Sequence, residues 1–406
     1  MLPYCYQIDI DKKYEMFSQI TSRYYSRQLK CIVDDNSISD KYGFVYPEKY
    51  FNYRNNMMCS FYKNKNKVKI GIQLSKNTFS NIITSNLPSE IIIDVCVFIE
   101  HFINKYYPNL SKYIYNHDTK EGFIRDIQIR HNLSNQFYIM INTISRLNKL
   151  INFKSIILDL YNYFRLHFKN GQLVNIYIKY ITPQTPAICN DIIPSPLIYD
   201  NYLHIDIFDK TLIISPNSFF QTNYDVAKEM YIHIQKIIGT NEQSDLILLD
   251  LFCGVGVYGS LFGEYFDKIV GIDINSESIR YALTNIKNNV KKFRTNQEKF
   301  KYICGDINKH IDTIINECDS HNAVVIVNPN RSGLKKTVCS TLIEMSEIIT
   351  KIIYVSCNIE SLKSDMDILS STFTITSAMG FNQFPLIDKH FETIIVLERS
   401  CSPSHK

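Results

Sequence analysis

The feature that most constrains the fold is a regular alternation of short apolar runs and helical segments after about residue 210. The apolar runs have the length of strands and occupy residues 245–252, 268–274, 301–307, 323–329, 351–357 and 392–399. Strands that alternate with helices at this spacing favour a doubly wound parallel sheet. Because the runs are apolar almost throughout, their strands are expected to be covered on both faces. The sequence therefore predicts an α/β protein with a Rossmann-like doubly wound sheet.

The length of 406 residues exceeds what one compact core usually holds, so more than one domain is expected. Residues 1–45 carry a mixed helical pattern and are predicted to form a mainly helical extension. Residues 46–209 combine helical patterns with strand-like runs at 67–74, 136–144 and 172–181, which favours an α+β domain. Residues 210–406 carry the alternating pattern and are predicted to form the doubly wound domain.

Charge and cysteine usage limit the class of protein. The net charge is only +4, from 44 Lys and Arg against 40 Asp and Glu, so contact with nucleic acid has to come from local patches. The 11 cysteines are dispersed without a C-x-x-C pair, and no metal site is expected. No apolar run approaches the ~18 residues of a membrane helix. Together with the lack of a signal-peptide pattern, these observations favour an intracellular, cytoplasmic protein.

A glycine-rich turn follows the first apolar run of the series. Gly254, Gly256 and Gly259 form G-x-G-x-x-G, which permits a tight turn and close approach of a ligand to a helix N-terminus. Asp273 ends the next run, 23 residues after Asp250, where a carboxylate can accept hydrogen bonds from a ribose. The pattern predicts a nucleoside cofactor, and both NAD and S-adenosylmethionine satisfy it.

Two further features favour S-adenosylmethionine over NAD. The spacing Asp250-x-x-Cys-Gly is more typical of methyltransferases, and a third acidic turn carries Asp306. Asp306 could contribute to the cofactor site, or it could cap the helix that follows.

Cys357 ends the fifth run, in the segment YVSCN. Ligands of doubly wound sheets bind at the carboxyl ends of the strands, so Cys357 is expected to face the cofactor crevice. If the last strand is antiparallel and adjacent to the fifth, its start lies ~4.8 Å away on the same edge. His390 and Glu392 would then lie close to Cys357.

Several ordered segments together resemble the RNA 5-methyluridine methyltransferases, the tRNA (uracil-5-)-methyltransferase family. The segments are SPNSFFQTN (215–223), LLDLFCGVG (248–256), VNPNRSGL (327–334), YVSCNIESLKSDMDIL (354–369) and HFE (390–392). A weaker similarity at 47–57 extends the resemblance over about residues 47–400. The resemblance implies a class I S-adenosylmethionine-dependent methyltransferase fold with an N-terminal α+β domain, and makes 210–406 the catalytic domain. It also implies an RNA substrate, in the first place the T-loop uridine of a tRNA.

The resemblance assigns roles to individual residues. Cys357 matches the nucleophile that adds to carbon 6 of uracil, and Glu392 matches the base that removes the proton from carbon 5. Arg331 matches the arginine of the D-P-P-R motif, and its charge is expected to lower the pKa of the Cys357 thiol. Positions that match cofactor contacts are Gln221, Phe252, Asp273 and Asn328, to which the turn pattern adds Gly254, Gly256 and Asp306.

Contacts with RNA are expected on the central domain. Arg54, Arg125 and Arg130 are candidates for these contacts, and Phe219 and Phe220 could supply an aromatic wall for an unstacked base. Core packing is the alternative for one of the two phenylalanines.

Departures from the family pattern leave other functions open. Asn328 replaces the aspartate of D-P-P-R, and Val257 occupies a position that is often polar in relatives. A non-catalytic or altered-activity RNA-binding protein on a degenerate methyltransferase scaffold is therefore the alternative function. Adenine amino-methylation, whose motif is N-P-P-aromatic, is a third hypothesis, although Asn330 is not aromatic.

Overall fold

The computed structural model describes residues 9, 11–19, 42–144, 152–186, 189, 192–198, 201–239, 245–293, 297–318, 322–387 and 390–400. The chain divides into two compact units. The first comprises residues 1–50, 207–211 and 223–406, and the second comprises residues 51–206 and 212–222. The sequence-based partition into 1–45, 46–209 and 210–406 stays a prediction about domains.

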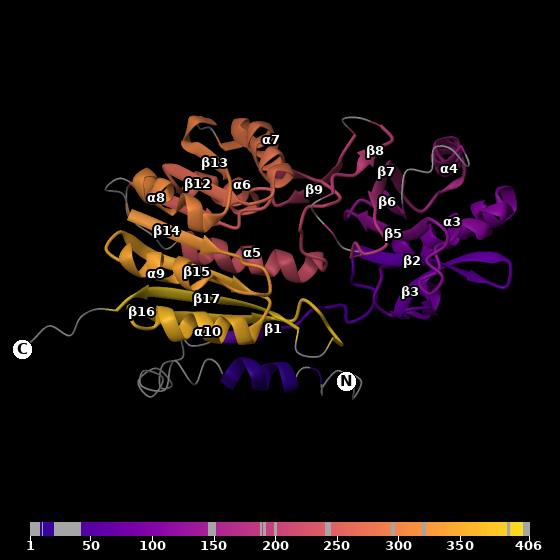
Figure 1. Cartoon of the computed structure of the whole chain (residues 1–406). Helices are drawn as coiled ribbons and strands as arrows, with labels where there is room; N and C mark the ends of the chain where they lie inside the picture. The colour runs from indigo at the N-terminus through magenta and orange to yellow at the C-terminus, as the bar shows by residue number, and fades with distance from the viewer. Residues whose placement is uncertain are drawn as a thin grey trace, which may run out of the picture. The chain divides into compact units, whose positions relative to one another are not determined.

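An eight-stranded sheet forms the centre of the first unit, in the order β1-β16-β17-β15-β14-β11-β12-β13 (Figure 1). Strands β11 to β15 run parallel where they pair, and their bounds are Leu246–Leu251, Lys268–Asp273, Phe300–Cys304, Asn322–Val327 and Ile349–Ser356. β17 (Glu392–Arg399) lies antiparallel between β15 and β16 (Phe373–Phe381), and β1 (Tyr42–Val45) pairs with β16 at the edge. The predicted α/β fold is thus confirmed.

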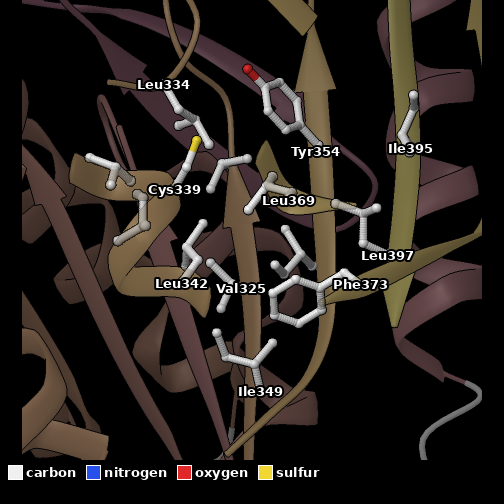
Figure 2. Packing of buried hydrophobic residues seen from close by; sticks show 14 of the residues in the cluster. Val325, Leu334, Cys339, Leu342, Ile349, Tyr354, Leu369, Phe373, Ile395 and Leu397 are labelled. Atoms are coloured by element: carbon white, nitrogen blue, oxygen red, sulfur yellow. The ribbon is translucent and has the colours of Figure 1, made fainter. Parts of the chain in front are cut away.

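One helix precedes β11, and one follows each of the five parallel strands, as the alternation predicts. Their bounds are Tyr224–Gly239 (α5), Val257–Phe262 (α6), Ser276–Phe293 (α7), Ile307–Cys318 (α8), Lys336–Glu344 (α9) and Ile359–Leu369 (α10). Apolar side chains of α8, α9 and α10 pack in one cluster with those of the strands, among them Val325, Leu342 and Leu369 (Figure 2). Residues 9 and 11–19 are helical as expected, whereas 42–45 form the strand β1.

The second unit contains a seven-stranded sheet in the order β4-β3-β2-β5-β6-β7-β8. The bounds are Asn56–Asn64 (β2), Lys67–Ser75 (β3), Thr78–Asn81 (β4), Ile124–His131 (β5), Gln136–Ile144 (β6), Gln172–Ile181 (β7) and Ser195–Pro196 (β8). Helices α3 (Glu90–Tyr106) and α4 (Phe153–His167) pack on this sheet through a shared apolar cluster. The predicted α+β character is confirmed, and β5 and β6 form an antiparallel hairpin.

The remaining elements are short. A two-stranded sheet joins β9 (Leu203–Ile207) to β10 (Lys210–Ile214), and four 3₁₀ turns occupy Ile82–Thr84, Pro108–Tyr113, Gly263–Tyr265 and Gln297–Lys299. Among the helices that the structure describes, none has the length and apolar character to span a bilayer.

A tyrosine of β13 fills the space beneath the glycine turn. Tyr302 pairs with Gly271 of β12, and Gly271 pairs with Asp250 of β11, so the three residues form one row across the sheet. The Tyr302 ring lies over Gly271, where an added Cβ atom would be 2.4 Å from the ring carbon Cε1. Its hydroxyl reaches Gly259 of α6, where an added Cβ would be 2.3 Å away. The glycines therefore make room for the aromatic ring that supports the turn.

We predict that Gly271→Ala destabilises the first unit by about 1 to 3 kcal/mol, because the methyl group has to displace the half-buried Tyr302 ring. Chemical denaturation measures the free energy of unfolding. Gly239→Ala at the end of α5 is the matched control, since a Cβ there meets no atom of the described residues within 4 Å. Equal stability of the two variants would contradict the packing role of Tyr302.

Candidate active site

Two neighbouring strand ends bring Cys357 and Glu392 together. Ser356, the last residue of β15, pairs with Thr393 of β17, and the Thr393 Oγ1 donates to the Ser356 carbonyl oxygen at 3.1 Å. Cys357 directly follows Ser356, and Glu392 directly precedes Thr393. The two side chains therefore leave adjacent strands at the same edge of the sheet. The predicted antiparallel neighbour of the fifth strand is confirmed.

The turn around Cys357 is fixed by polar side chains on both sides. Asn358 caps α10, because its side-chain oxygen accepts from the Glu360 backbone N–H at 3.1 Å. The Asn358 backbone N–H donates to the Ser356 Oγ at 3.2 Å. The Asn358 Nδ2 donates to the Arg331 carbonyl oxygen at 2.8 Å, which ties this turn to the turn after β14.

The thiol of Cys357 is protonated near neutral pH. Burial raises the pKa of Cys357 to about 11, and the negative charge of Glu392 acts in the same direction. The positive charge of Arg331 lowers this pKa, but it does not outweigh the other two effects. The charge of Arg331 thus acts in the expected direction, but the thiol pKa stays above its ordinary value because burial and Glu392 outweigh it.

Two buried tyrosines are near enough to Glu392, which is only 2% exposed, for its charge to act on them. Burial raises the pKa of Tyr231 in α5 and of Tyr258 in α6, and the charge of Glu392 contributes to both shifts. The two rings contact each other edge to face, with centroids 6.3 Å apart. The sequence patterns did not single out either tyrosine, since aromatic residues within amphipathic helices are usually core residues.

Asn328 contacts one of these tyrosines. It follows β14, and its Nδ2 donates to the Tyr258 hydroxyl oxygen at 3.2 Å. An aspartate at this position could only accept from Tyr258, so the departure from D-P-P-R reverses the direction of this hydrogen bond. Asn328 therefore has a partner that matches its amide.

The glycine turn at the end of β11 has the backbone conformation that its sequence predicts. Phe252, Gly254 and Gly256 all have positive φ, at 66°, 53° and 71°. The Gly254 N–H donates to Asp273 Oδ2 at 3.0 Å, and the Asn275 N–H donates to Asp273 Oδ1 at 2.8 Å. Each Asp273 oxygen keeps a lone pair for another donor. A Cβ on Gly254 would meet no atom of the described residues within 4 Å, so the turn borders open space.

A second carboxyl group lies beneath the turn. Asp250 in β11 is fully buried. Burial raises the pKa of Asp250 to about 8, the charge of Asp273 adds to the shift, and the Gly259 backbone N–H opposes it. Burial also raises the pKa of Cys253, whose side chain is buried beside the turn. The turn thus rests on groups that are largely uncharged at neutral pH.

Asp306 caps the helix that follows it. Its Oδ1 accepts from the Asn308 backbone N–H at 3.0 Å and from the Asn308 side chain, which lowers the pKa of Asp306. Lys335 lies 3.5 Å from the other oxygen. The capping alternative therefore describes the contacts of Asp306 in the free protein.

Gln221 and the two phenylalanines belong to the second unit. Gln221 is buried, and its carbonyl oxygen accepts from Asn55 Nδ2 at 3.2 Å. Phe220 is 3% exposed and packs as a core residue, whereas Phe219 is 63% exposed. Only Phe219 is available to an unstacked base.

Two of the arginines considered as RNA contacts are buried. Arg125 pairs with Asp126 at 2.6 Å, and Arg130 donates to the Ser218 carbonyl oxygen at 3.1 Å. The prediction that Arg125 and Arg130 contact RNA at the surface is therefore wrong, because their guanidinium groups are engaged inside the unit. Arg54 is half-buried.

Comparisons with known proteins relate the second half of the chain to one family. A sequence profile of the tRNA (Uracil-5-)-methyltransferase family matches residues 200–400. A tRNA/tmRNA (uracil-C(5))-methyltransferase of Idiomarina loihiensis is 34% identical over 191 residues, which are 45% of this chain and 49% of that protein. A protein of Acanthamoeba polyphaga mimivirus, provisionally named an RNA methyltransferase, is 32% identical over 207 residues, which are 49% of this chain and 51% of that protein. The chain thus spans about half the length of these two relatives.

Longer matches exist at lower identity. An uncharacterized RNA methyltransferase of Clostridium acetobutylicum is 26% identical over 370 residues, which are 88% of this chain and 75% of that protein. The crystal structure of Pyrococcus abyssi tRNA (uracil-54, C5)-methyltransferase in complex with S-adenosyl-L-homocysteine has a TM-score of 0.67 at 19% identity, covering 96% of this chain and 83% of that chain. The predicted methyltransferase fold with a separate N-terminal sheet domain is confirmed.

We predict that alkylation of Cys357 by iodoacetamide speeds up about tenfold per pH unit up to about pH 11, because only the thiolate reacts. Glu392→Gln should raise the rate at pH 8 about three- to tenfold, and Arg331→Gln should lower it by a similar factor. Peptide mass spectrometry distinguishes Cys357 from the other cysteines.

Glu347→Gln and Arg399→Gln provide charge-matched controls, since these two exposed residues pair with each other. If the controls changed the Cys357 rate as much as the site variants, the local electrostatic account would be wrong.

Proposed function

Since residues 200–400 belong to the tRNA (uracil-5-)-methyltransferase family, we propose that this chain transfers a methyl group from S-adenosylmethionine to carbon 5 of a uridine in tRNA. The observation that carries the proposal is the juxtaposition of a thiol and a carboxyl group, Cys357 and Glu392, at the ends of two paired strands. A methylation at a ring carbon needs this pair, because one group has to activate the ring and another has to accept a proton.

The residues around the glycine turn fit the cofactor. Open space over Gly254 allows a ligand to lie against the backbone, and Asp273 can accept hydrogen bonds from ribose hydroxyls. We assign Phe252, Gly254, Gly256, Asp273 and Asn328 to this site. Asp306, which caps α8, completes the proposed set. Gln221 lies in the second unit, and its cofactor contact stays a prediction from the resemblance. When bound, S-adenosylmethionine supplies a methyl group on a positively charged sulfur.

The two site residues act in sequence on the uracil ring. The Cys357 thiolate adds to carbon 6, and the electron pair of the ring double bond makes carbon 5 nucleophilic enough to take the methyl group. The Glu392 carboxylate then accepts the proton from carbon 5, the bond between carbon 6 and sulfur breaks, and the thiolate is released. Arg331 favours the thiolate in both steps, because its charge lowers the pKa of Cys357.

Recognition of tRNA is the finer part of the proposal. The Idiomarina relative is named for tRNA and tmRNA, which supports this substrate class. The uridine has to leave its stack to reach Cys357. Phe219, in the second unit, is 63% exposed, and it is proposed to stack on a base of the RNA.

A non-catalytic RNA-binding protein is the alternative that the replacement at Asn328 motivates. Asn328 donates a hydrogen bond to Tyr258, so the replacement of the aspartate does not leave a polar group of the site without a partner. This favours a catalytic protein over a non-catalytic one.

Incubation with tRNA transcript and labelled S-adenosylmethionine, followed by nucleoside analysis, tests the proposal. We expect 5-methyluridine with the wild-type protein, and none with Cys357→Ala because no ring activation can occur. With tRNA containing 5-fluorouridine, the wild type should form an adduct that survives denaturation, because a fluorine at carbon 5 cannot leave as a proton does.

Two variants separate the roles in this experiment. Glu392→Gln should accumulate the adduct with ordinary tRNA, since proton removal is slowed. Cys304→Ala, at an exposed cysteine, should form the 5-fluorouridine adduct like the wild type. Binding of tRNA without adduct or product would support the alternative, and methyl transfer that survives Cys357→Ala would support adenine amino-methylation.

A further inference from the structure

A buried carboxylate outside the proposed catalytic pair joins the two turns of the site. Asp365 lies in α10 and is 4% exposed. Its Oδ2 accepts two hydrogen bonds, from the Tyr354 hydroxyl at 2.6 Å and from the Leu334 backbone N–H at 2.8 Å. The Cys339 thiol lies 3.9 Å from Oδ1. In Figure 2 the Tyr354 hydroxyl lies at the end of the cluster that Leu334 and Cys339 also occupy.

The two donors come from the two segments that carry the site. Tyr354 lies in β15, three residues before Cys357, and Leu334 lies three residues after Arg331. One oxygen atom of Asp365 therefore links the strand that ends at Cys357 with the turn that carries Arg331. Removal of this acceptor would leave two buried donors without a partner, which is costly enough to shift a turn.

The turn itself is shaped to meet this carboxylate. Gly333 has a positive φ of 73°, and an added Cβ would lie 2.5 Å from Asp365 Oδ2. The Gly333 N–H donates to the Asn330 carbonyl oxygen at 3.0 Å, which closes the turn around Arg331. The turn thus lies directly against the carboxylate, without room for a side chain between them.

A second link closes the connection on the solvent side. The Asn358 Nδ2 donates to the Arg331 carbonyl oxygen at 2.8 Å. The Arg331 turn is therefore held to the Cys357 segment by Asp365 on the buried side and by Asn358 on the solvent side. The buried link consists of a single carboxylate, that of Asp365.

We propose that Asp365 is a positioning residue that holds the Arg331 turn against the end of β15, so that the guanidinium charge reaches the Cys357 thiol. The inference rests on the proposed function only where it takes the Cys357 thiol as a nucleophile. The positioning of the Arg331 turn is a property of the protein without RNA or cofactor. The charged and titratable groups that act on Cys357 are Glu392 and Arg331. Those that contact Asp365 are Tyr354 and Cys339.

The test is a double-mutant cycle on the reactivity of Cys357, which needs neither cofactor nor RNA. The alkylation rate of Cys357 is measured at pH 8 in the wild type, Asp365→Ala, Arg331→Gln and the double variant. We expect Asp365→Ala to lower the rate about three- to tenfold, as Arg331→Gln does, because the thiol loses its cationic neighbour. We expect Asp365→Ala to cause no further decrease in the Arg331→Gln background.

The direction of the change distinguishes positioning from simple electrostatics. Removal of a negative charge by itself would raise the rate of a nearby thiol, whereas loss of positioning lowers it. Leu369→Ala, a buried change in the same helix that leaves the hydrogen bonds of Asp365 in place, is the control for general destabilisation and should leave the rate unchanged.

If Asp365→Ala does not fold, Tyr354→Phe removes one of the two donors and should lower the rate in the same direction. An unchanged or faster alkylation rate in Asp365→Ala would overturn the proposal. So would an equal decrease caused by Asp365→Ala in the wild type and in the Arg331→Gln background. If the double-mutant cycle gave the expected alkylation rates but the wild-type protein transferred no methyl group to tRNA, the result would count against the proposed function alone.

Discussion

The candidate site depends on the position of one antiparallel strand. β17 pairs with β15 on one side and with β16 on the other, although it follows both in the chain. A parallel strand in this place would begin at the opposite edge of the sheet and would carry Glu392 away from Cys357. Because β17 runs the other way, the first residue of one strand lies beside the residue that follows the other. The proximity of the proposed nucleophile and base thus results from the direction of β17 more than from the conformation of any loop.

Much of this arrangement can be predicted from the sequence, because strand ends and glycine turns leave strong local signals. The apolar runs locate β11 to β15, and the spacing from Asp250 to Asp273 locates the cofactor edge. Burial is what the sequence does not show. Phe219 and Phe220 are adjacent and chemically identical, yet only one is exposed, and the thiol pKa of Cys357 depends on how much water the fold removes. Arg125 and Arg130 resembled surface cations for the same reason.

The polar groups of the site are held by contacts that the family pattern alone does not explain. Asn328 acquires a partner in Tyr258, and Asp365 gathers donors from two distant segments. Both residues belong to stretches whose resemblance to the family is clear, but motif letters do not state which atoms meet. Long-range hydrogen bonds of this kind join residues that only the folded sheet brings together. They have no characteristic spacing along the chain, so a sequence pattern cannot reveal them.

The late place of β17 in the chain also affects how the protein is made. Until residue 399 has left the ribosome, β15 and β16 have no strand to join them, and the nascent sheet presents two apolar edges. Folding of this unit therefore has to wait for nearly all of its translation, and the contacts that complete it span long stretches of chain. A polypeptide cut short before Glu392 would lack both the strand that joins β15 to β16 and the proposed base. Such a chain would be a ready target for chaperones and proteases rather than a partially active enzyme.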